Sequence, residues 1–171
     1  MKPIYSLLFL SLLFVGCQPA EDKSANEAFE RNSQTALAYL QGFQNENPDY
    51  SQFAKDFITN DTGFGGKDSI NLEQFMMNEK NILAQYDFKI LTEPLVFLPG
   101  VNVDTKKADG SVRYYADWQV TRPAAEGVEA KSGIIRIYES LDFDENGKIR
   151  FQQAYGDFSG LMMYLNGGGG M

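Results

Sequence analysis

Few residue types in this chain could carry out chemistry. Its 171 residues include 23 acidic and 15 basic side chains, a single cysteine and no histidine. Without histidine, every catalytic triad that depends on an imidazole is excluded, and one cysteine cannot build a cluster of soft metal ligands. We therefore expect no metal site and no cofactor. The most conspicuous candidate for chemistry is Asp157.

Asp157 stands where a strand passes into a short apolar helix. The stretch GKIRFQQAYGDFSGLMMYL, residues 147–165, reads as the exit of a hairpin, a strand, a bend and a helix. An aspartate at such a position can cap the helix by accepting backbone N–H groups, or it can serve as an acid or base. Alternation along the strand predicts that Asp157 turns inward, partly capped, and contributes to a pocket.

The first half of the chain reads as helical. An apolar stripe predicts a helix that ends at residues 45–48, and Asp49 then caps a short second helix that carries Phe53 and Phe57. Residues 61–69 form a turn-rich loop. Asn71 caps a clear amphipathic helix, with Gln74 placed for the reciprocal hydrogen bond. The buried face of that helix is Leu72, Phe75, Met76, Glu79, Ile82, Leu83 and Tyr86.

The second half changes to a β pattern. The β-rich runs cover residues 90–103, 112–121, 129–143 and 148–156. They are separated by Asp109-Gly110, by residues 122–127 and by Asn146-Gly147, which are turn sequences. The fold class is therefore α+β, with two or three helices laid on one face of an antiparallel meander and a short helix at the end.

Alternation along these strands selects the side chains of a possible pocket. The residues assigned to the inner face are Val112, Tyr114, Ala116, Trp118 and Val120, then Ile135, Ile137, Glu139, Leu141 and Phe143, and finally Ile149, Phe151, Gln153 and Tyr155. Tyr114, Trp118, Glu139, Gln153 and Tyr155 are the pocket candidates among them. Glu139 and Gln153 either line the pocket or lie near a rim and reach water. A bulge would reverse the assignment beyond it.

The opposite face of the sheet is polar but rich in tyrosine and arginine. Its residues include Arg113, Tyr115, Gln119, Arg136 and Tyr138. Tyrosine and arginine are enriched at protein interfaces, so this face predicts a homodimer. Asp117 shares the face with Arg113, which indicates a surface ion pair or a contact between subunits rather than a catalytic pair.

The N-terminus resembles the signal peptide of a bacterial lipoprotein. Lys2 precedes an apolar stretch at residues 4–15, which is too short to span a bilayer, and Gly16 precedes Cys17. We expect residues 1–16 to be a signal peptide, Cys17 to carry palmitate or similar acyl chains, and residues 17–26 to be a polar tether. The alternative is ordinary signal cleavage after Ala20.

After the tether, we expect residues 27–166 to form one domain, followed by a flexible glycine tail at 167–171.

The charge balance limits the partners. The formal net charge is −8, and loss of Lys2 with the signal peptide makes it −9. Nucleic acids and anionic membrane surfaces both require clustered Lys and Arg, so neither is an expected electrostatic partner. A lipid anchor at Cys17 would hold the domain to a membrane of the bacterial cell envelope, on its periplasmic or outer-surface side.

The order of elements, with helices followed by a meander and then residues 147–165, resembles the nuclear transport factor 2-like superfamily, close to its SnoaL-like branch. The resemblance covers about residues 27–166. It implies a cone-shaped fold, with helices closing a curved sheet around a pocket, and frequent homodimers. Asp157 resembles the acid–base aspartate of SnoaL-like cyclases, which pair it with a histidine that this chain lacks.

Three functions follow from this reading, because the fold by itself does not select one. The leading interpretation is a membrane-anchored lipoprotein that binds a small, largely apolar molecule without catalysis. The alternative is a SnoaL- or ketosteroid-isomerase-like enzyme with Asp157 as general acid–base and Tyr114 or Tyr155 as hydrogen-bond donor. The third is a non-catalytic, dimeric protein-interaction module.

Overall fold

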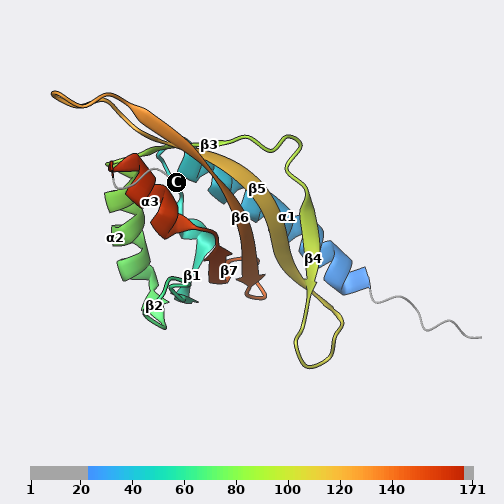
Figure 1. The fold of residues 1–171 in the computed structure, drawn as a ribbon. Helices are drawn as coiled ribbons and strands as arrows, with labels where there is room; N and C mark the ends of the chain where they lie inside the picture. The colour runs from blue at the N-terminus through green and yellow to red at the C-terminus, as the bar shows by residue number, and fades with distance from the viewer. Residues whose placement is uncertain (1–22, 168–171) are drawn as a thin grey trace, which may run out of the picture.

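The structure, a computed structural model, describes residues 23–167 and is an α+β fold. Its elements are α1 (Lys23–Gln44), the 3-10 turn η1 (Tyr50–Gln52), β1 (Phe53–Thr59), β2 (Ile70–Asn71), α2 (Leu72–Leu83), β3 (Asp87–Ile90), β4 (Phe97–Val101), β5 (Ala108–Arg122), β6 (Lys131–Phe143), β7 (Ile149–Tyr155) and α3 (Phe158–Leu165). Figure 1 shows α1 crossing one face of a strongly curved sheet, with α2 and α3 at the same side of the molecule.

The sheet is mixed rather than a purely antiparallel meander. Its strand order is β2-β1-β7-β6-β5-β3, and β4 pairs with the other end of β5. Strands β5, β6 and β7 form the expected antiparallel meander, whereas β1 pairs with β7 in parallel. Strand β1, which belongs to the first half of the chain, thus occupies the edge of β7 that β6 leaves free.

Helix α1 confirms the first predicted helix. It begins at Lys23, four residues before the expected start of the domain, and ends at Gln44, directly before the predicted stop. Ala36, Tyr39 and Leu40 are buried against the sheet. No helix among residues 23–167 is both long and apolar enough to cross a membrane.

The second predicted helix is wrong beyond a single turn. Asp49 does cap a short element, because its side chain accepts a hydrogen bond from the Ser51 amide, but that element is the three-residue turn η1. The chain then extends as β1, and both Phe53 and Phe57 are buried in the core. Residues four apart lie on the same face of a strand as well as of a helix, so the spacing of Phe53 and Phe57 fits either element.

The amphipathic helix α2 is confirmed, including its capping box. The Asn71 side chain accepts a hydrogen bond from the Gln74 amide at 3.0 Å, and the Gln74 side chain accepts one from the Asn71 amide at 3.3 Å. Only one residue of α2 is fully buried, and it is the acid Glu79. The helix therefore carries a carboxyl group into the interior of the fold.

One predicted turn and one predicted strand differ in the structure. Asn146-Gly147 does connect β6 to β7, with Gly147 at a φ of +75°. Asp109-Gly110, in contrast, lies inside β5, and residues 102–107 make the turn after β4. Gly110 has a φ of +79°, and a Cβ there would lie 2.7 Å from the Cβ of Ala28. The glycine allows α1 to approach β5, where Asn32 donates a hydrogen bond to the Gly110 carbonyl at 2.8 Å. The run 90–103 is also interrupted, since β3 ends at Ile90 and β4 begins at Phe97.

A β-bulge between β6 and β7 reverses part of the predicted inner face. Phe143 pairs with Ile149, but the register shifts at once, and Leu141 pairs with Gln152. From that point Gln152 and Ala154 share the inner side with Leu141 and Glu139. The inward direction predicted for Gln153 and Tyr155 is therefore wrong, whereas the inner face predicted for β5 is buried along its whole length.

Candidate functional site

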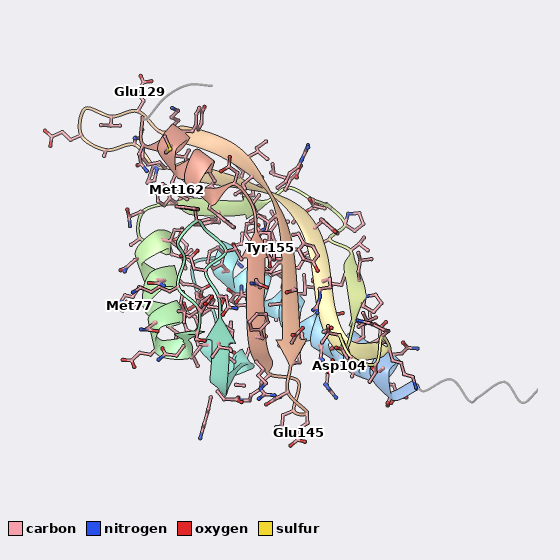
Figure 2. The ribbon with its side chains drawn as sticks, turned by 60° about the horizontal axis from the view of Figure 1, so that its bottom comes forward. Met77, Asp104, Glu129, Glu145, Tyr155 and Met162 are labelled. Carbon is pink, nitrogen blue, oxygen red and sulfur yellow. The ribbon has the colours of Figure 1, made fainter. Side chains whose placement is uncertain are left out.

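A cavity of about 140 Å³ lies between the curved sheet and the helices. Its walls are mostly apolar and come from α1, α2, α3 and strands β3, β5, β6 and β7. The lining residues are Tyr39, Leu40, Phe43, Glu79, Ile82, Phe88, Tyr114, Trp118, Val120, Ile135, Ile137, Glu139, Gln152, Ala154, Phe158, Leu161 and Met162. In Figure 2, Met162 of α3 lies toward the end of the molecule that carries Glu129, away from Asp104 and Glu145.

Two buried acids belong to this lining. Glu79 extends from α2, and the phenol of Tyr39 on α1 donates a hydrogen bond to its Oε1 atom. Glu139 extends from β6, and the phenol of Tyr114 on β5 donates to its Oε2 atom. All four side chains are at least nine-tenths buried. Each carboxyl group thus has a tyrosine donor from a neighbouring element.

Gln152 connects the two acid–tyrosine pairs. Its Nε2 group donates a hydrogen bond to Oε1 of Glu139 and a longer one, of 3.4 Å, to the Tyr39 phenol oxygen. The result is one buried polar network of five side chains, which runs from Glu79 through Tyr39 and Gln152 to Glu139 and Tyr114. We name these five residues the acid network.

Burial dominates the proton affinity of both acids. Loss of hydration raises the pKa of Glu79 from 4.5 to about 7, although the hydrogen bond from Tyr39 and the nearby Tyr50 hydroxyl group lower it in part. Loss of hydration also raises the pKa of Glu139 to about 7; Tyr114 and Gln152 lower it, and the charge of Glu79 raises it. Groups that exchange protons near neutral pH are suited to acid–base chemistry or to pH-dependent binding.

The tyrosines of the network remain neutral donors. Burial, followed by the neighbouring carboxylates, raises the pKa values of Tyr39 and Tyr114 well above 10. The network nevertheless leaves some hydrogen-bonding capacity unused. Oε2 of Glu79, Oε1 of Gln152 and Nε1 of Trp118 are buried and have no hydrogen-bond partner. Such atoms are rare in folded proteins because an unpaired buried polar group costs about 1–3 kcal/mol.

The structure separates the pocket candidates of the sequence into two groups. Tyr114, Trp118 and Glu139 line the cavity. Gln153 and Tyr155 do not, since they lie on the outer face beyond the bulge. Tyr155 is 47% exposed, and its position is labelled in Figure 2.

Sequence reasoning missed three members of the acid network. Tyr39 is not among the predicted site residues. Gln152 alternates with the residues predicted to face inward on its strand, so alternation places it on the outer face. Glu79 lies on the predicted buried face of its helix, without a role. A signal for Glu79 was present, because an acid in the apolar stripe of an amphipathic helix is rarely buried without a partner. No sequence pattern indicated that its partner would be Tyr39, forty residues away.

Asp157 has a different place from the one expected. It is exposed and is absent from the cavity lining. Its Oδ1 atom accepts a hydrogen bond from the Gly160 amide at 2.9 Å, which makes it the N-cap of α3. The predicted inward direction is wrong, because the bulge reverses the sides of β7 and the chain bends at Gly156 before the helix.

The outer face of the sheet carries a row of tyrosines. Tyr115, Tyr138 and Tyr155 lie directly opposite one another on β5, β6 and β7. Their ring centroids are 5.0 Å and 6.2 Å apart along the row. Asp117 forms an exposed ion pair with Arg136, at 3.1 Å, rather than with Arg113. Within residues 23–167, no group of three or more His, Cys, Asp or Glu side chains could hold a metal ion.

The fold has close counterparts among solved structures. An NTF2-like protein from Anabaena variabilis matches 81% of this chain and 94% of its own, with a TM-score of 0.59 and 12% identity. A candidate SnoaL-like polyketide cyclase from Shewanella denitrificans matches 80% and 96%, with a TM-score of 0.56 and 14% identity. An LEH-like epoxide hydrolase from M. tuberculosis matches 81% and 92%, with a TM-score of 0.55 and 12% identity.

These likenesses confirm the predicted fold: the chain has the cone-shaped nuclear transport factor 2-like fold, with SnoaL-like proteins among its structural neighbours. At such low identity they establish the fold alone. No protein-family model matches the chain, and no curated protein sequence matches it. The function must therefore be argued from the cavity.

Proposed function

We propose that this protein binds a small, largely apolar molecule in the cavity of its cone. The observation that carries this proposal is the cavity itself, with mostly aliphatic and aromatic walls and the acid network among its lining. Ligand pockets in proteins commonly combine such walls with a few converging polar groups that orient the ligand. The apolar walls supply affinity, and the acid network supplies orientation.

The size of the cavity limits the ligand. A cavity of about 150 Å³ holds a benzene molecule, and this one measures about 140 Å³. We therefore expect ligands of roughly six to ten non-hydrogen atoms, or longer molecules with one end inserted.

Filling the cavity tests the proposal. Ala154 lines the cavity, while its neighbour Gln153 lies on the outer face of the same strand. Ala154→Leu should abolish binding of small aromatic probes followed by ligand-observed NMR, and Gln153→Leu should leave it unchanged. Mass spectrometry of compounds that co-purify with the wild-type protein would identify the natural ligand. Equal probe binding by both variants would overturn the proposal.

A second candidate function is proton transfer, as in an isomerase or cyclase. The acid network favours it, since two buried carboxyl groups with pKa values of about 7 each accept a hydrogen bond from a neutral tyrosine. One carboxylate would abstract a proton beside a carbonyl, and a protonated group would stabilise the enolate oxygen. Exchange of deuterium into small cyclic ketones, lost in Glu139→Gln, would support this function over simple binding.

We further propose that the protein is anchored to the bacterial cell envelope through acylated Cys17. The support comes from the sequence, with Lys2 and the apolar residues 4–15 before Gly16 and Cys17. Cys17 lies outside the described residues. The described residues begin at Lys23, within α1.

The outer face supports a third proposal, a homodimer. The tyrosine row, together with Ile134 at 63% exposure, presents aromatic and apolar surface on a face that no helix covers in Figure 1. Aromatic residues are enriched where proteins meet. A protein-interaction module that uses the same face with another partner is the competing interpretation.

A further inference from the structure

The cavity holds two acids without a counter-charge. None of the residues that line it is Lys or Arg. The ion pairs found in residues 23–167 join Arg113, Arg136 and Arg150 to aspartates on the surface, and none involves Glu79 or Glu139. A buried carboxylate without a cation is costly, which is why both groups are held partly protonated near neutral pH.

The unused hydrogen-bonding atoms of the cavity lining are mainly acceptors. Oε2 of Glu79 and Oε1 of Gln152 each accept nothing, and the single unused donor is Nε1 of Trp118. Both acceptors belong to the acid network, and both side chains are more than nine-tenths buried. A ligand group that satisfies either atom must donate an N–H or O–H hydrogen bond.

The wall beside the acid network is aromatic. Phe43 packs edge to face against Phe88 at 4.9 Å and against Trp118 at 5.9 Å between ring centroids. All three residues line the cavity. Aromatic faces attract cations, and the attraction increases when water is excluded. The overall charge of −8 also favours the approach of a cation over that of an anion.

We propose that the ligand of this cavity is a small organic ammonium ion, whose charged nitrogen lies at Glu79, Gln152 and Glu139 and whose apolar body packs against the aromatic wall. This inference rests on the proposed binding function and specifies its ligand class. The ammonium group supplies two or three N–H donors and the missing positive charge in one group of atoms. Its hydrocarbon part occupies the aliphatic and aromatic remainder of the cavity.

A neutral carbonyl compound is the main competitor, and the two classes differ in their dependence on pH. An ammonium ion binds the ionised acids, so its binding releases protons and strengthens as the pH rises through about 7. A carbonyl oxygen accepts a hydrogen bond from a protonated acid, so its binding takes up protons and weakens over the same range. The titratable groups that face the acids are Tyr39, Tyr50 and Tyr114, and burial keeps all three neutral there.

Benzylamine and benzyl alcohol provide a matched pair of probes, because they share size and shape and differ in charge. Isothermal titration at about pH 5.5 and pH 8.5, in buffers of different ionisation enthalpy, measures affinity and proton release together. We expect benzylamine to bind at least about tenfold more tightly than benzyl alcohol at the higher pH, and to release protons at pH values below about 7.

Substitution of each buried acid tests whether that residue causes the preference for benzylamine. Glu79→Gln and Glu139→Gln should each lose most of the preference for benzylamine while retaining the binding of benzyl alcohol. The control Glu73→Gln changes an exposed acid on α2, the helix that also carries Glu79, and should leave the preference intact.

The pH dependence of the wild-type protein tests the inference even if a variant does not fold. Binding of benzyl alcohol without a preference for benzylamine would overturn the inference and leave the binding function standing. Failure of both probes would overturn both.

Discussion

Tyr114 and Glu139 lie directly opposite each other on β5 and β6, and the tyrosine donates its phenol proton to the carboxyl group across the strands. Tyr114 is completely buried, so its hydroxyl group must find a partner inside the fold. Glu139 is likewise buried, with 5% of its surface exposed. Each residue therefore supplies the hydrogen-bond partner that the other needs when it is buried. The register between β5 and β6 places the two side chains next to each other.

Removal of that donor should cost stability. Tyr114→Phe leaves Oε2 of Glu139 without its hydrogen bond and should destabilise the fold by about 1–3 kcal/mol, as measured by urea unfolding. Tyr115→Phe is the matched control, because the neighbouring residue lies on the outer face and is 64% exposed. We expect that control to stay within about 0.5 kcal/mol of the wild type. Equal losses in both variants would contradict the buried hydrogen bond.

The acid network should make stability fall as the pH rises. Both acids have folded-state pKa values of about 7, above the ordinary 4.5, so the folded protein holds more protons than the unfolded chain between these values. Their contribution is most favourable below about pH 4.5, decreases with a slope of at most about 1.4 kcal/mol per pH unit for each acid, and levels off above about pH 7.

The double variant Glu79→Gln with Glu139→Gln isolates this effect. Glutamine keeps the shape of each side chain but does not titrate, so the free energy of unfolding of the variant should fall less steeply than that of the wild type between about pH 4.5 and 7. The comparison is made by urea unfolding at matched pH values. Parallel curves for the two proteins would show that the buried acids do not cause the slope.

The sequence alone predicts those parts of the fold in which short-range patterns and the tertiary structure favour the same arrangement. The inner face of β5 and the capping box at Asn71 follow from alternation and from short-range hydrogen bonds, and the structure confirms both. Prediction failed where the outcome depends on distant parts of the chain. The extension of β1 requires its pairing with β7, and Gly110 is needed because α1 packs against β5, not because the chain turns there.

The site was harder to predict than the fold for the same reason. One bulge next to Phe143 exchanges the sides of Gln152 and Gln153, which moved one glutamine into the acid network and the other out of it. Asp157 interrupts an apolar stretch, which favours a role in the pocket, but in the structure its side chain caps a helix locally. Glu79 is the more informative interruption, since the hydrophobic stripe of α2 carries it into the interior.

The cap at Asp157 should affect stability and leave ligand binding unchanged. Asp157→Ala removes the acceptor for the Gly160 amide and should destabilise the protein by about 1 kcal/mol. Asp157→Asn keeps an acceptor oxygen and should lose little, since Asn and Asp cap helices about equally well. Both variants should bind small aromatic probes as the wild type does. A loss of probe binding in Asp157→Asn would show that Asp157 takes part in ligand binding.

The anchor is tested in living bacteria. Cys17→Ser should abolish metabolic labelling with radioactive palmitate and should release the protein from the membrane fraction. The reason is that lipoprotein signal peptides, which the N-terminus resembles, require a cysteine at the acylated position. A matched variant, Ser24→Ala, keeps Cys17 and should remain labelled and membrane-bound. Unchanged labelling of Cys17→Ser would reject the proposal of a lipid anchor.

The last prediction concerns the outer face. If Tyr115, Tyr138 and Tyr155 form the centre of a dimer interface, the wild-type protein should sediment as a dimer at about tens of micromolar. Tyr115→Glu should shift it to a monomer, because it places a negative charge in the aromatic row without disturbing the core. Met77→Glu makes the same kind of change at an exposed residue of α2 (Figure 2), away from the tyrosine row, and should remain dimeric. A monomeric wild type would refute the homodimer and leave this face to a different protein partner.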